Sequence, residues 1–553
     1  MSKVVENTQT NQEYDLLVIG AGIFGATLAL EASQRGLNVL LVDKNDFGSA
    51  TSANSLKTIH AGLRYLQSMD VRSSIISAKE RKAWLTIAPG LVKPLPCILP
   101  TTKDLMKSRL VVGAGILFYN LLTLGRNTGM PNELQIPAAH LIPKSLIKKY
   151  LPNLHDSRVT GGACWYDAQA INTERLVLAC ILAAKESGAR VLNYQEVEQL
   201  ESCQGSYQAQ LTGLNERVLA RFVVDCSGRS CFLEKQTING MDTPQINDLA
   251  YVKAVNVIIN KKLSSHAFGI KVKDDSGMTR LLFTAPWQNT LFEGDYTLVG
   301  TWYYKAGAKK DNQLSEQELA QCIKQVNSAF ETPICSVKDI VQVHVGYLPA
   351  DKARLQAKGP DASLIKHAKL IPWSGAGGKN GLYSLKGTKF TLARRAAEET
   401  INSINKQYGL NLSSSRSANQ PLWQDNKASL GKLNSLGLTE EQLEFVQVYF
   451  SAALAKIVEV CEGDPEMMAH IPSAEYCFRG LFEYCFRYEY VQHLTDLLIR
   501  RIPIGSGSLP SRNTVQYGLE FLSGKLLWDA KRQQNEVAAL EAYYMKYENE
   551  TWK

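Results

Sequence analysis

Short apolar runs, glycine clusters and helical periodicity alternate near the N-terminal end of the chain. Residues 14–19 (YDLLVI) form an apolar run that is typical of a strand buried on both faces of a parallel sheet. Glycines follow, then a helical stretch that ends at Gly36, and a second apolar run covers residues 38–42. This order predicts a strand–helix–strand unit with two parallel strands joined by one helix.

The rest of the chain divides into an alternating part, a β-rich part and a helical part. Residues 160–230 predict strands and a helix at 173–187, whereas short alternating runs over 248–350 predict an antiparallel sheet. A polar stretch is typical of a linker, and helical periodicity resumes after it. We therefore expect an α/β + α architecture: a Rossmann-like dinucleotide-binding domain at 1–245 and 351–402, an antiparallel β substrate domain at 246–350, a linker at 403–437 and a C-terminal helical domain at 438–553.

The glycine cluster after the first strand has the spacing of a dinucleotide-binding turn. Gly20, Gly22 and Gly25 end the predicted strand and open the predicted helix. There the first glycine allows a tight turn, the second lets the backbone approach a pyrophosphate, and the third lets helix and strand pack closely. Asp43 closes the second strand, where a carboxylate accepts hydrogen bonds from ribose hydroxyls. The motif predicts a dinucleotide without separating FAD from NAD.

The residues after Asp43 decide between these two cofactors. Residues 50–66 read A-T-S-A-N-S-L-K-T-I-H-A-G-L-R-Y-L. They resemble the family of FAD-linked glycerol-3-phosphate dehydrogenases, whose pattern is close to A-T-S-S…S-K-L-I-H-G-G-L-R-Y-L. The resemblance continues through most of the chain, at residues 166–178, 223–228, 286–301, 387–398 and 474–501. It implies that the dinucleotide is FAD.

The resemblance also implies which residues contact the cofactor. They come from the glycine turn, the loop after the second strand, and the segments that return to the flavin: Gly20, Gly22, Gly25, Asp43, Thr51, Ser52, His60, Gly62, Ser227, Gly228, Gly387, Thr388, Lys389, Phe390 and Thr391. A covalent flavin tether through His60 is an alternative, but the resemblance implies non-covalent binding. Lys389 is expected to act in catalysis, because a cation near the flavin ring stabilises its anionic reduced form.

On the substrate side, we expect contacts from a further group of residues: Arg64, Tyr65, Tyr347, Leu348 and Arg394. Arg64 matches an arginine implied to contact substrate, and a surface ion pair is its alternative reading. Residues 346–349 read G-Y-L-P where the family has G-V-R-P, so Leu348 replaces an arginine implied to hold the substrate phosphate. Losing a guanidinium removes a strong charge-assisted contact. The resemblance therefore implies the family's cofactor, FAD, but it does not imply the family's substrate.

Two more residues bear on catalysis. Asn256 stands where the family has a histidine near the substrate, and His344 follows on a strand expected to face the flavin. Since Asn256 cannot take a proton, His344 is a candidate base; a structural histidine is the alternative. Residues 300–303 read G-T-W-Y instead of G-T-T-D. Together with Tyr347, Trp302 and Tyr303 suggest a larger, more aromatic pocket.

Composition and charge bear on the cellular location of the protein and on its partners. The net charge is +8, and the 11 cysteines contain no C-x-x-C pair, which fits reduced thiols in a cytoplasm and predicts no metal site. Residues 110–124 form an apolar stretch after three basic residues, too short to span a bilayer. It is either an interfacial helix on the inner face of the plasma membrane or a buried core helix. We expect no nucleic-acid partner.

The predicted reaction is oxidation of a secondary alcohol, with hydride transfer to flavin N5 and proton transfer to a side chain or water. Quinone, oxygen or another acceptor would then take the electrons. Three hypotheses stay open: an enzyme of the glycerol-3-phosphate dehydrogenase type, a related dehydrogenase or oxidase for a hydroxy acid, an amine or a carrier-bound intermediate, and a non-enzymatic flavin-binding protein. Lys389 and Arg394 argue against the third, and Leu348 favours the second over the first.

Overall fold

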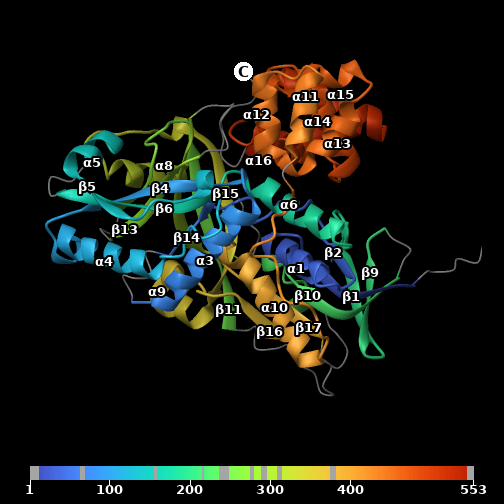
Figure 1. Ribbon diagram of the computed structural model, residues 1–553, viewed down its shortest axis with the longest axis horizontal. Coiled ribbons are helices and arrows are strands. Elements are labelled where there is room, and N and C mark those ends of the chain that lie inside the picture. Colours follow the sequence, from blue (N-terminus) through green and yellow to red (C-terminus); the bar gives the residue numbers. More distant parts are fainter. Residues whose placement is uncertain are drawn as a thin grey trace, which may run out of the picture.

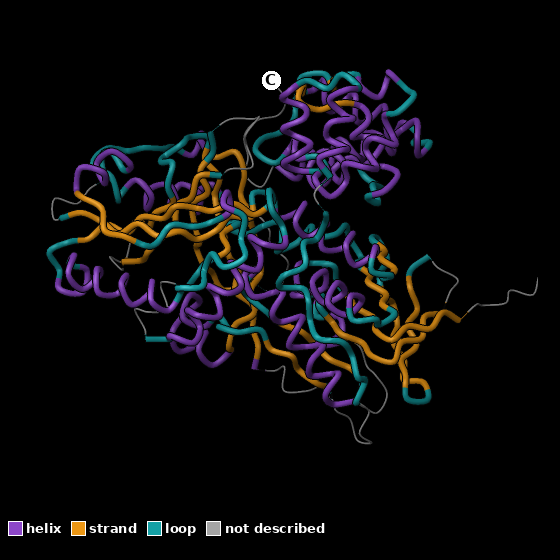
Figure 2. The backbone as a smooth tube through the Cα atoms, in the orientation of Figure 1, coloured by secondary structure: helices purple, strands orange, loops and turns teal. Residues whose placement is uncertain are grey.

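The computed structural model describes residues 11–544, apart from 63–68, 155–158, 214–216, 236–247, 274–278, 288–294, 308–313, 374–380 and 425. Two β-sheets lie side by side, and a group of C-terminal helices forms a third body above them (Figures 1 and 2). Helix α6 (Thr173–Glu186) lies between the first sheet and the C-terminal helices.

The first sheet has the strand order β16-β17-β10-β1-β2-β7, with the β8–β9 hairpin attached to β10. Strands β1, β2, β7, β10 and β17 are parallel, as the N-terminal pattern predicts. The strands are β1 (Asn11–Ile19), β2 (Val39–Val42), β7 (Arg190–Leu192), β8 (Val197–Cys203), β9 (Ser206–Leu211), β10 (Arg217–Asp225), β16 (Lys369–Pro372) and β17 (Leu382–Lys386).

Both faces of this sheet are covered. Leu16 and Val18 pack into a core shared with α1 (Ile23–Gln34), α6 and α10 (Ala393–Tyr408). Leu17 alternates to the other face, where it packs with residues of the β8–β9 hairpin. A strand buried on both faces is apolar throughout, which is why residues 14–19 carry no clear alternation.

The second sheet has the order β15-β11-β14-β13-β12-β4-β6-β3, with β5 paired to β6. Among the described residues, its strand pairs are antiparallel except β12 with β4. Its strands are β3 (Thr58–Ile59), β4 (Val92–Thr101), β5 (His140–Pro143), β6 (Gly161–Ala170), β11 (Leu249–Ile259), β12 (Ala267–Lys273), β13 (Thr279–Pro286), β14 (Thr297–Lys305) and β15 (Ile340–Asp351).

The sheet membership corrects the expected domain boundary. Four strands of the second sheet, β3 to β6, fall within residues 1–245, which the sequence had assigned to the dinucleotide-binding domain. The antiparallel sheet is therefore completed by segments inserted between β2 and α6. Local patterning identifies a strand but not the sheet to which it pairs, because pairing depends on contacts far apart in the chain.

The two faces of the second sheet differ. Val255 and Val257 of β11 and Val343 and Val345 of β15 pack with α8 (Glu316–Asn327) in one core. Since side chains alternate along a strand, Ala254 and Asn256 point to the opposite face. That face turns toward the loop after β2, because a Cβ on Gly346, which pairs with Ala254, would lie 3.0 Å from the Thr51 side chain.

The remaining helices cover the edges and form the C-terminal body. They are α3 (Val71–Ile87), α4 (Arg109–Leu122), α5 (Lys144–Tyr150), α7 (Phe232–Lys235), α9 (Lys352–Ser363), α11 (Lys427–Ser435), α12 (Glu440–Tyr449), α13 (Leu454–Cys461), α14 (Arg479–Tyr488), α15 (Arg512–Leu526) and α16 (Ala530–Tyr544). A short hairpin pairs β18 (His470–Ile471) with β19 (Ala474–Phe478), and a π-helix, η10, covers Asp496–Arg501.

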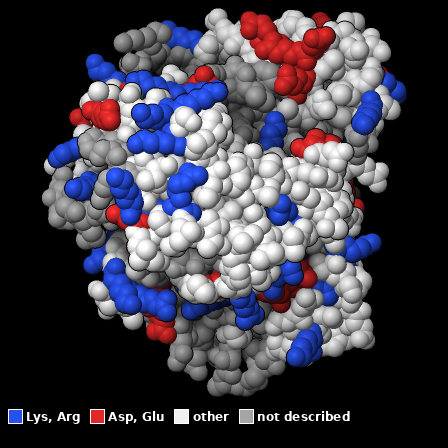
Figure 3. All heavy atoms as spheres, turned by 60° about the vertical axis from the view of Figure 1, so that its left-hand side comes forward, with Lys and Arg blue, Asp and Glu red and all other residues white. Residues whose placement is uncertain are grey.

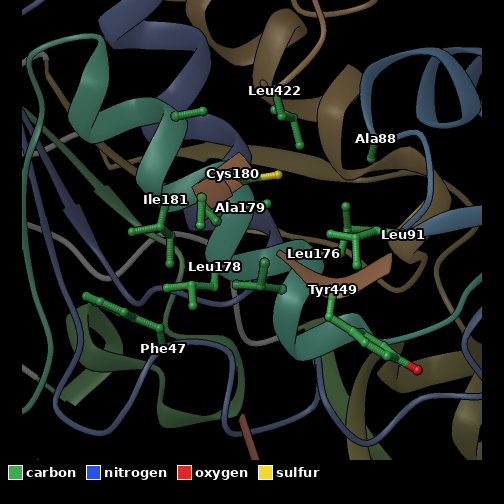
Figure 4. Close-up of a cluster of buried hydrophobic side chains, with 14 of the residues drawn as sticks. Phe47, Ala88, Leu91, Leu176, Leu178, Ala179, Cys180, Ile181, Leu422 and Tyr449 are labelled. Carbon is green, nitrogen blue, oxygen red and sulfur yellow. The ribbon is translucent and has the colours of Figure 1, made fainter. Parts of the chain in front are cut away.

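The expected linker is partly helical and packed. Helix α10 runs six residues into it, to Tyr408, and α11 lies within it. Leu422 is buried, and Figure 4 shows it in a cluster with Tyr449 of α12 and Cys180 of α6. This apolar cluster joins the C-terminal helices to the first sheet. The segment 403–437 is mostly polar, so its composition did not indicate that a few apolar residues, such as Leu422, are buried.

Candidate cofactor and active site

The glycine turn packs β1, α1 and β10 together too closely for side chains. Gly20 has φ +100°, and a Cβ there would come within 2.8 Å of the Cys226 carbonyl oxygen. A Cβ on Gly25 would lie 1.9 Å from the Gly20 carbonyl oxygen. Both positions therefore need glycine for packing, as the motif predicts. Gly22 is less crowded, with the Ser52 hydroxyl 3.1 Å from its hypothetical Cβ.

The N-terminus of α1 suits an anion. Its N-cap is Gly22, which has no side chain to occupy the helix end, and its first turn carries no acidic residue. Ser52 reaches this end and accepts a hydrogen bond from the Ile23 amide at 2.9 Å. A helix N-terminus directs its amides and its positive dipole end outward, which suits a pyrophosphate.

Asp43 lies beside the same turn. Its carboxylate accepts from the Ala21 amide at 2.7 Å and from the Asn45 amide at 2.9 Å. Burial raises the pKa of Asp43 to about 6, although these two hydrogen bonds oppose the rise. The pyrophosphate position and the carboxylate are thus adjacent, as a dinucleotide requires. These residues fit FAD.

Two further segments return to this site. A Cβ on Gly20 would lie 2.8 Å from the Ser227 Cα, so the turn after β10 lies against the glycine turn. The carbonyl of Gly228 accepts from the Tyr251 hydroxyl at 2.8 Å, which ties this turn to β11. Gly387 lies over Phe24 of α1, whose ring would be 2.1 Å from a Cβ at that position.

The 388–391 segment faces the second sheet. Thr388 donates to the Ile365 carbonyl at 2.8 Å, and Lys389 donates to the Lys366 carbonyl at 3.1 Å. The Phe390 ring packs against Trp84, with ring centroids 5.8 Å apart. The next residue, Thr391, accepts from the His60 amide at 3.1 Å. The predicted cofactor segments around residues 20, 52, 60, 227 and 391 thus converge.

His60 is held by a carboxylate that the sequence had not singled out as functional. Nδ1 of His60 lies 3.4 Å from Oδ2 of Asp167, and the Ala61 amide donates to Oδ1 at 2.6 Å. Burial works against ionisation of Asp167, yet the contacts with His60 and Ala61 hold its pKa below the ordinary value. The His60 side chain remains 52% exposed, and Gly62, two residues on, has φ +79°. A fixed, ionised carboxylate orients the ring.

The second sheet supplies the wall opposite the cofactor segments. The His60 ring lies 5.8 Å from Phe283 of β13, which pairs with Gly300 of β14. Gly300 pairs with Asn256, and Asn256 with His344 of β15. Directly paired residues of antiparallel strands project to the same face. We call this face the site face.

His344 and Asn256 are brought together, but both are engaged inside the wall. His344 is buried; its Nε2 lies 3.1 Å from the Gln342 side-chain oxygen, and its ring packs edge-on to Trp287 at 5.9 Å. Asn256 is also buried, and its Oδ1 accepts from the Thr301 hydroxyl at 2.7 Å. These contacts favour a structural role for His344 over the role of a base.

The predicted substrate residues divide three ways. Leu348 shares the site face with His344 and is half-buried. Tyr347 alternates to the other face, where it packs at the edge of the α8 core and stacks under Arg229. Arg64 and Tyr65 lie outside the described residues.

Arg394 does not line the substrate site, which corrects the prediction. Its guanidinium forms a two-point ion pair with Glu80, at 2.8 and 2.6 Å, and also contacts Glu398 and Ser417. It is buried, so it joins α10 to α3. The motif placed it correctly after the cofactor loop, but helix periodicity turns it away from the site.

The expected aromatic pocket is also only partly correct. Trp302 is buried in the α8 core and donates to Gln325 at 2.9 Å, so it cannot line a pocket on the site face. Tyr303 pairs with Ala254 and lies on the site face. A register shift between Val255 and Asn256 sets this alternation, and such bulges are not readable from sequence.

Comparison with known proteins supports FAD as the cofactor of this site. Residues 15–400 match the FAD dependent oxidoreductase family, and the chain belongs to that family. Its cofactor is accordingly FAD. The described residues contain no group of acidic, cysteine and histidine side chains that could hold a metal ion.

Individual relatives extend the likeness over more than nine-tenths of the chain. Glycerol-3-phosphate dehydrogenase of Synechocystis sp. is 25% identical over 532 residues, covering 93% of this chain and 92% of that protein. Glycerol-3-phosphate dehydrogenase 1 of Mycobacterium tuberculosis is 27% identical over 514 residues, covering 92% and 95%. The structure of the glycerol-3-phosphate dehydrogenase from Bacillus halodurans complexed with FAD superposes with a TM-score of 0.70 at 19% identity, covering 98% and 97% of the two chains. This confirms the predicted fold class and the family resemblance.

Proposed function

We propose that the protein oxidises a small alcohol, with His60 as the base that takes the hydroxyl proton. The observation that carries this is the His60–Asp167 pair: an exposed imidazole, oriented by a buried carboxylate and placed between the cofactor segments and the site face. FAD supplies the hydride acceptor when bound. Asp167 stabilises the imidazolium that results, because the carboxylate is held ionised.

Other residues of the site hold the substrate or the cofactor in place and take no part in the proton transfer. Asn256, fixed by Thr301, presents a rigid polar wall on the site face. Lys389, anchored on the Lys366 carbonyl, is the predicted cation beside the flavin. Its ammonium would stabilise negative charge on the reduced ring.

The test compares two histidines. His60→Gln should retain FAD but lower the rate of flavin reduction by substrate about 10²- to 10⁴-fold, the usual contribution of a general base. His344→Gln is the matched control, since His344 is bound to Gln342 within the wall. If His344→Gln abolishes reduction while His60→Gln leaves it unchanged, His344 is the base and this assignment is wrong.

For the substrate, we propose an alcohol that carries less charge than glycerol 3-phosphate. The curated relatives act on glycerol 3-phosphate by name. Here Leu348 and its cross-strand neighbour Val252 put two apolar side chains at one end of the site face. A phosphate dianion beside these two side chains would lose water and gain no charged partner from either of them. Related structures of lower similarity include an L-proline dehydrogenase, so an amine substrate is the alternative to test.

We also propose a peripheral membrane contact through α4. The helix buries Ile116 and Tyr119 but exposes an outward apolar stripe. Several large side chains near it are more than half exposed: Leu105, Met106, Leu110, Leu117, Leu121 and Leu124. A buried core helix would not leave this stripe in water, so the interfacial reading is favoured. Among the described residues, no helix is long and apolar enough to cross a membrane.

Charge supports the same contact. Lys103, which precedes α4, and Lys144, Lys148 and Lys149 of α5 are exposed. Figure 3, which turns this side of the molecule forward, shows lysine and arginine side chains around a broad uncharged area. Basic residues around an apolar helix face suit anionic lipid headgroups. The site would then deliver electrons to an acceptor held at the membrane, on its cytoplasmic side.

A flotation assay tests the contact. A double substitution, Leu117→Asp with Leu121→Asp, should move the protein from anionic liposomes into the free fraction. Gln135→Asp, in the exposed segment after α4, is the control for added negative charge alone. Wild-type protein that never floats with anionic liposomes would contradict the proposal.

A further inference from the structure

A buried aspartate connects the cofactor loop to the C-terminal helices. Asp46 follows Asp43 by three residues and is 1% exposed. Its carboxylate accepts from Arg501 at two points, both 2.7 Å, and from Nε of Arg500 at 2.5 Å. Asn193 at the end of β7 donates to it at 2.9 Å. Burial alone would raise the pKa of Asp46, but the two guanidinium groups hold it well below the usual range.

The arginines are themselves fixed inside the C-terminal body. They are the last two residues of the π-helix η10, an uncommon geometry that recurs at functional sites. Arg501 donates from Nε to the Glu489 carbonyl at 2.6 Å, and Arg500 pairs with Asp496. Asp496 also accepts from the Tyr194 hydroxyl at 2.7 Å, so the cluster contacts the first sheet a second time.

The short loop after Asp43 carries this connection to the cofactor site. The Gly48 amide donates to the Ala21 carbonyl at 3.0 Å, within the glycine turn. Phe47 packs edge-on against Tyr490 at 5.7 Å, and Figure 4 shows it beside Leu178 of α6. Residues 46 and 47 thus face the C-terminal body, while Asp43 and Gly48 hold the turn that receives the dinucleotide.

We propose that the C-terminal helical body is a second support of the FAD site, and that Arg500 and Arg501, acting through Asp46, couple its docking to FAD binding. The arginines are positioning residues, since they hold the loop and do not reach the glycine turn themselves. Coupling of this kind is reciprocal: docking of the helices favours FAD, and FAD favours docking by the same factor. The inference rests on FAD binding alone and is independent of the substrate.

The first measurement needs no substitution. Hydrogen exchange of the backbone amides at 489–501 is followed in wild-type apoprotein and after addition of FAD. The proposal predicts slower exchange in this segment with FAD, although the segment belongs to another body of the fold. Exchange that does not change with FAD overturns the proposal.

The second measurement is the Kd for FAD in substituted proteins. Asp46→Asn keeps the shape but removes the charge, and it should weaken FAD binding at least tenfold, within the usual range of coupling. Glu536→Gln is the matched control: Glu536 is also buried and accepts from His493 and the Leu494 amide, but it contacts no residue of the cofactor loop. Its Kd should stay within about twofold of wild type.

Arg501→Lys covers the case in which Asp46→Asn does not fold. It keeps the charge and loses the two-point contact, so a smaller loss of FAD affinity is expected. An unchanged Kd in both Asp46→Asn and Arg501→Lys would overturn the proposal. An equal loss in Glu536→Gln would also overturn it, because the effect would then be general destabilisation of the C-terminal body.

Discussion

Replacing Leu348 by arginine is expected to improve the use of glycerol 3-phosphate. The side chain lies on the site face of β15, in line with His344, and is half-buried. An arginine there would keep one edge in water, so its guanidinium would not bear the full cost of burial. The family resemblance implies that an arginine at this position holds a substrate phosphate.

The expected size follows from one charged hydrogen bond. Such a bond contributes about 1.5–3 kcal/mol, which corresponds to about a ten- to hundredfold gain in affinity. Because the phosphate does not react, the contact should act equally on substrate and transition state. The gain should therefore appear mainly in KM, with little change in kcat.

Steady-state kinetics with an artificial electron acceptor measures the effect. kcat/KM for glycerol 3-phosphate is compared in wild type, Leu348→Arg and Leu348→Gln, the last of which adds a long polar side chain without charge. The expected phosphate contact is refuted if kcat/KM rises no more in Leu348→Arg than in Leu348→Gln. It is also refuted if wild type already reaches about 10⁴ M⁻¹s⁻¹, the low end of the ordinary enzyme range.

Three further predictions concern the cofactor site and its frame. Gly22→Val should give folded but colourless protein, because its methyl groups would fill the approach to the pyrophosphate; full flavin occupancy, read from the absorbance spectrum, would contradict this. FAD affinity should fall as the pH drops through about 6, the raised pKa of Asp43, because the neutral acid accepts ribose hydrogen bonds less well. FAD titrations on both sides of pH 6 check this, and Asp43→Asn should remove the pH dependence. Glu80→Gln should lower the free energy of unfolding by about 1.5–3 kcal/mol in denaturant titrations, since Arg394 would lose its two-point partner but keep Glu398; a loss below about 1 kcal/mol would show that the pair is not structural.

The features that the sequence predicted well are those fixed by contacts between residues close together in the chain. The glycine turn, the strand before it and Asp43 obey steric and packing requirements within about 25 residues, and the structure reproduces them. Motif likeness also implied that His60 and Thr391, far apart in the chain, lie at one site, and the structure joins them by a hydrogen bond.

The parts that sequence missed depend on long-range pairing. The membership of β4 and β6 in the second sheet follows from contacts with β12 and β3, and the inward turn of Trp302 follows from a β-bulge. Arg394 stands at its motif position, but its side chain pairs with the buried carboxylate of Glu80 on another helix. Asp167 stood inside a matched segment, and its buried position beside His60 became visible only in three dimensions.

We expect bound FAD to be reduced by an alcohol whose proton goes to His60. Anaerobic mixing of the purified protein with a panel of alcohols, hydroxy acids, amines and glycerol 3-phosphate, followed by flavin absorbance, tests it most directly. We expect rapid bleaching by at least one alcohol that carries no phosphate, and slow bleaching by glycerol 3-phosphate. Bleaching by an amine alone, or by no compound while a chemical reductant still bleaches the flavin, would contradict it.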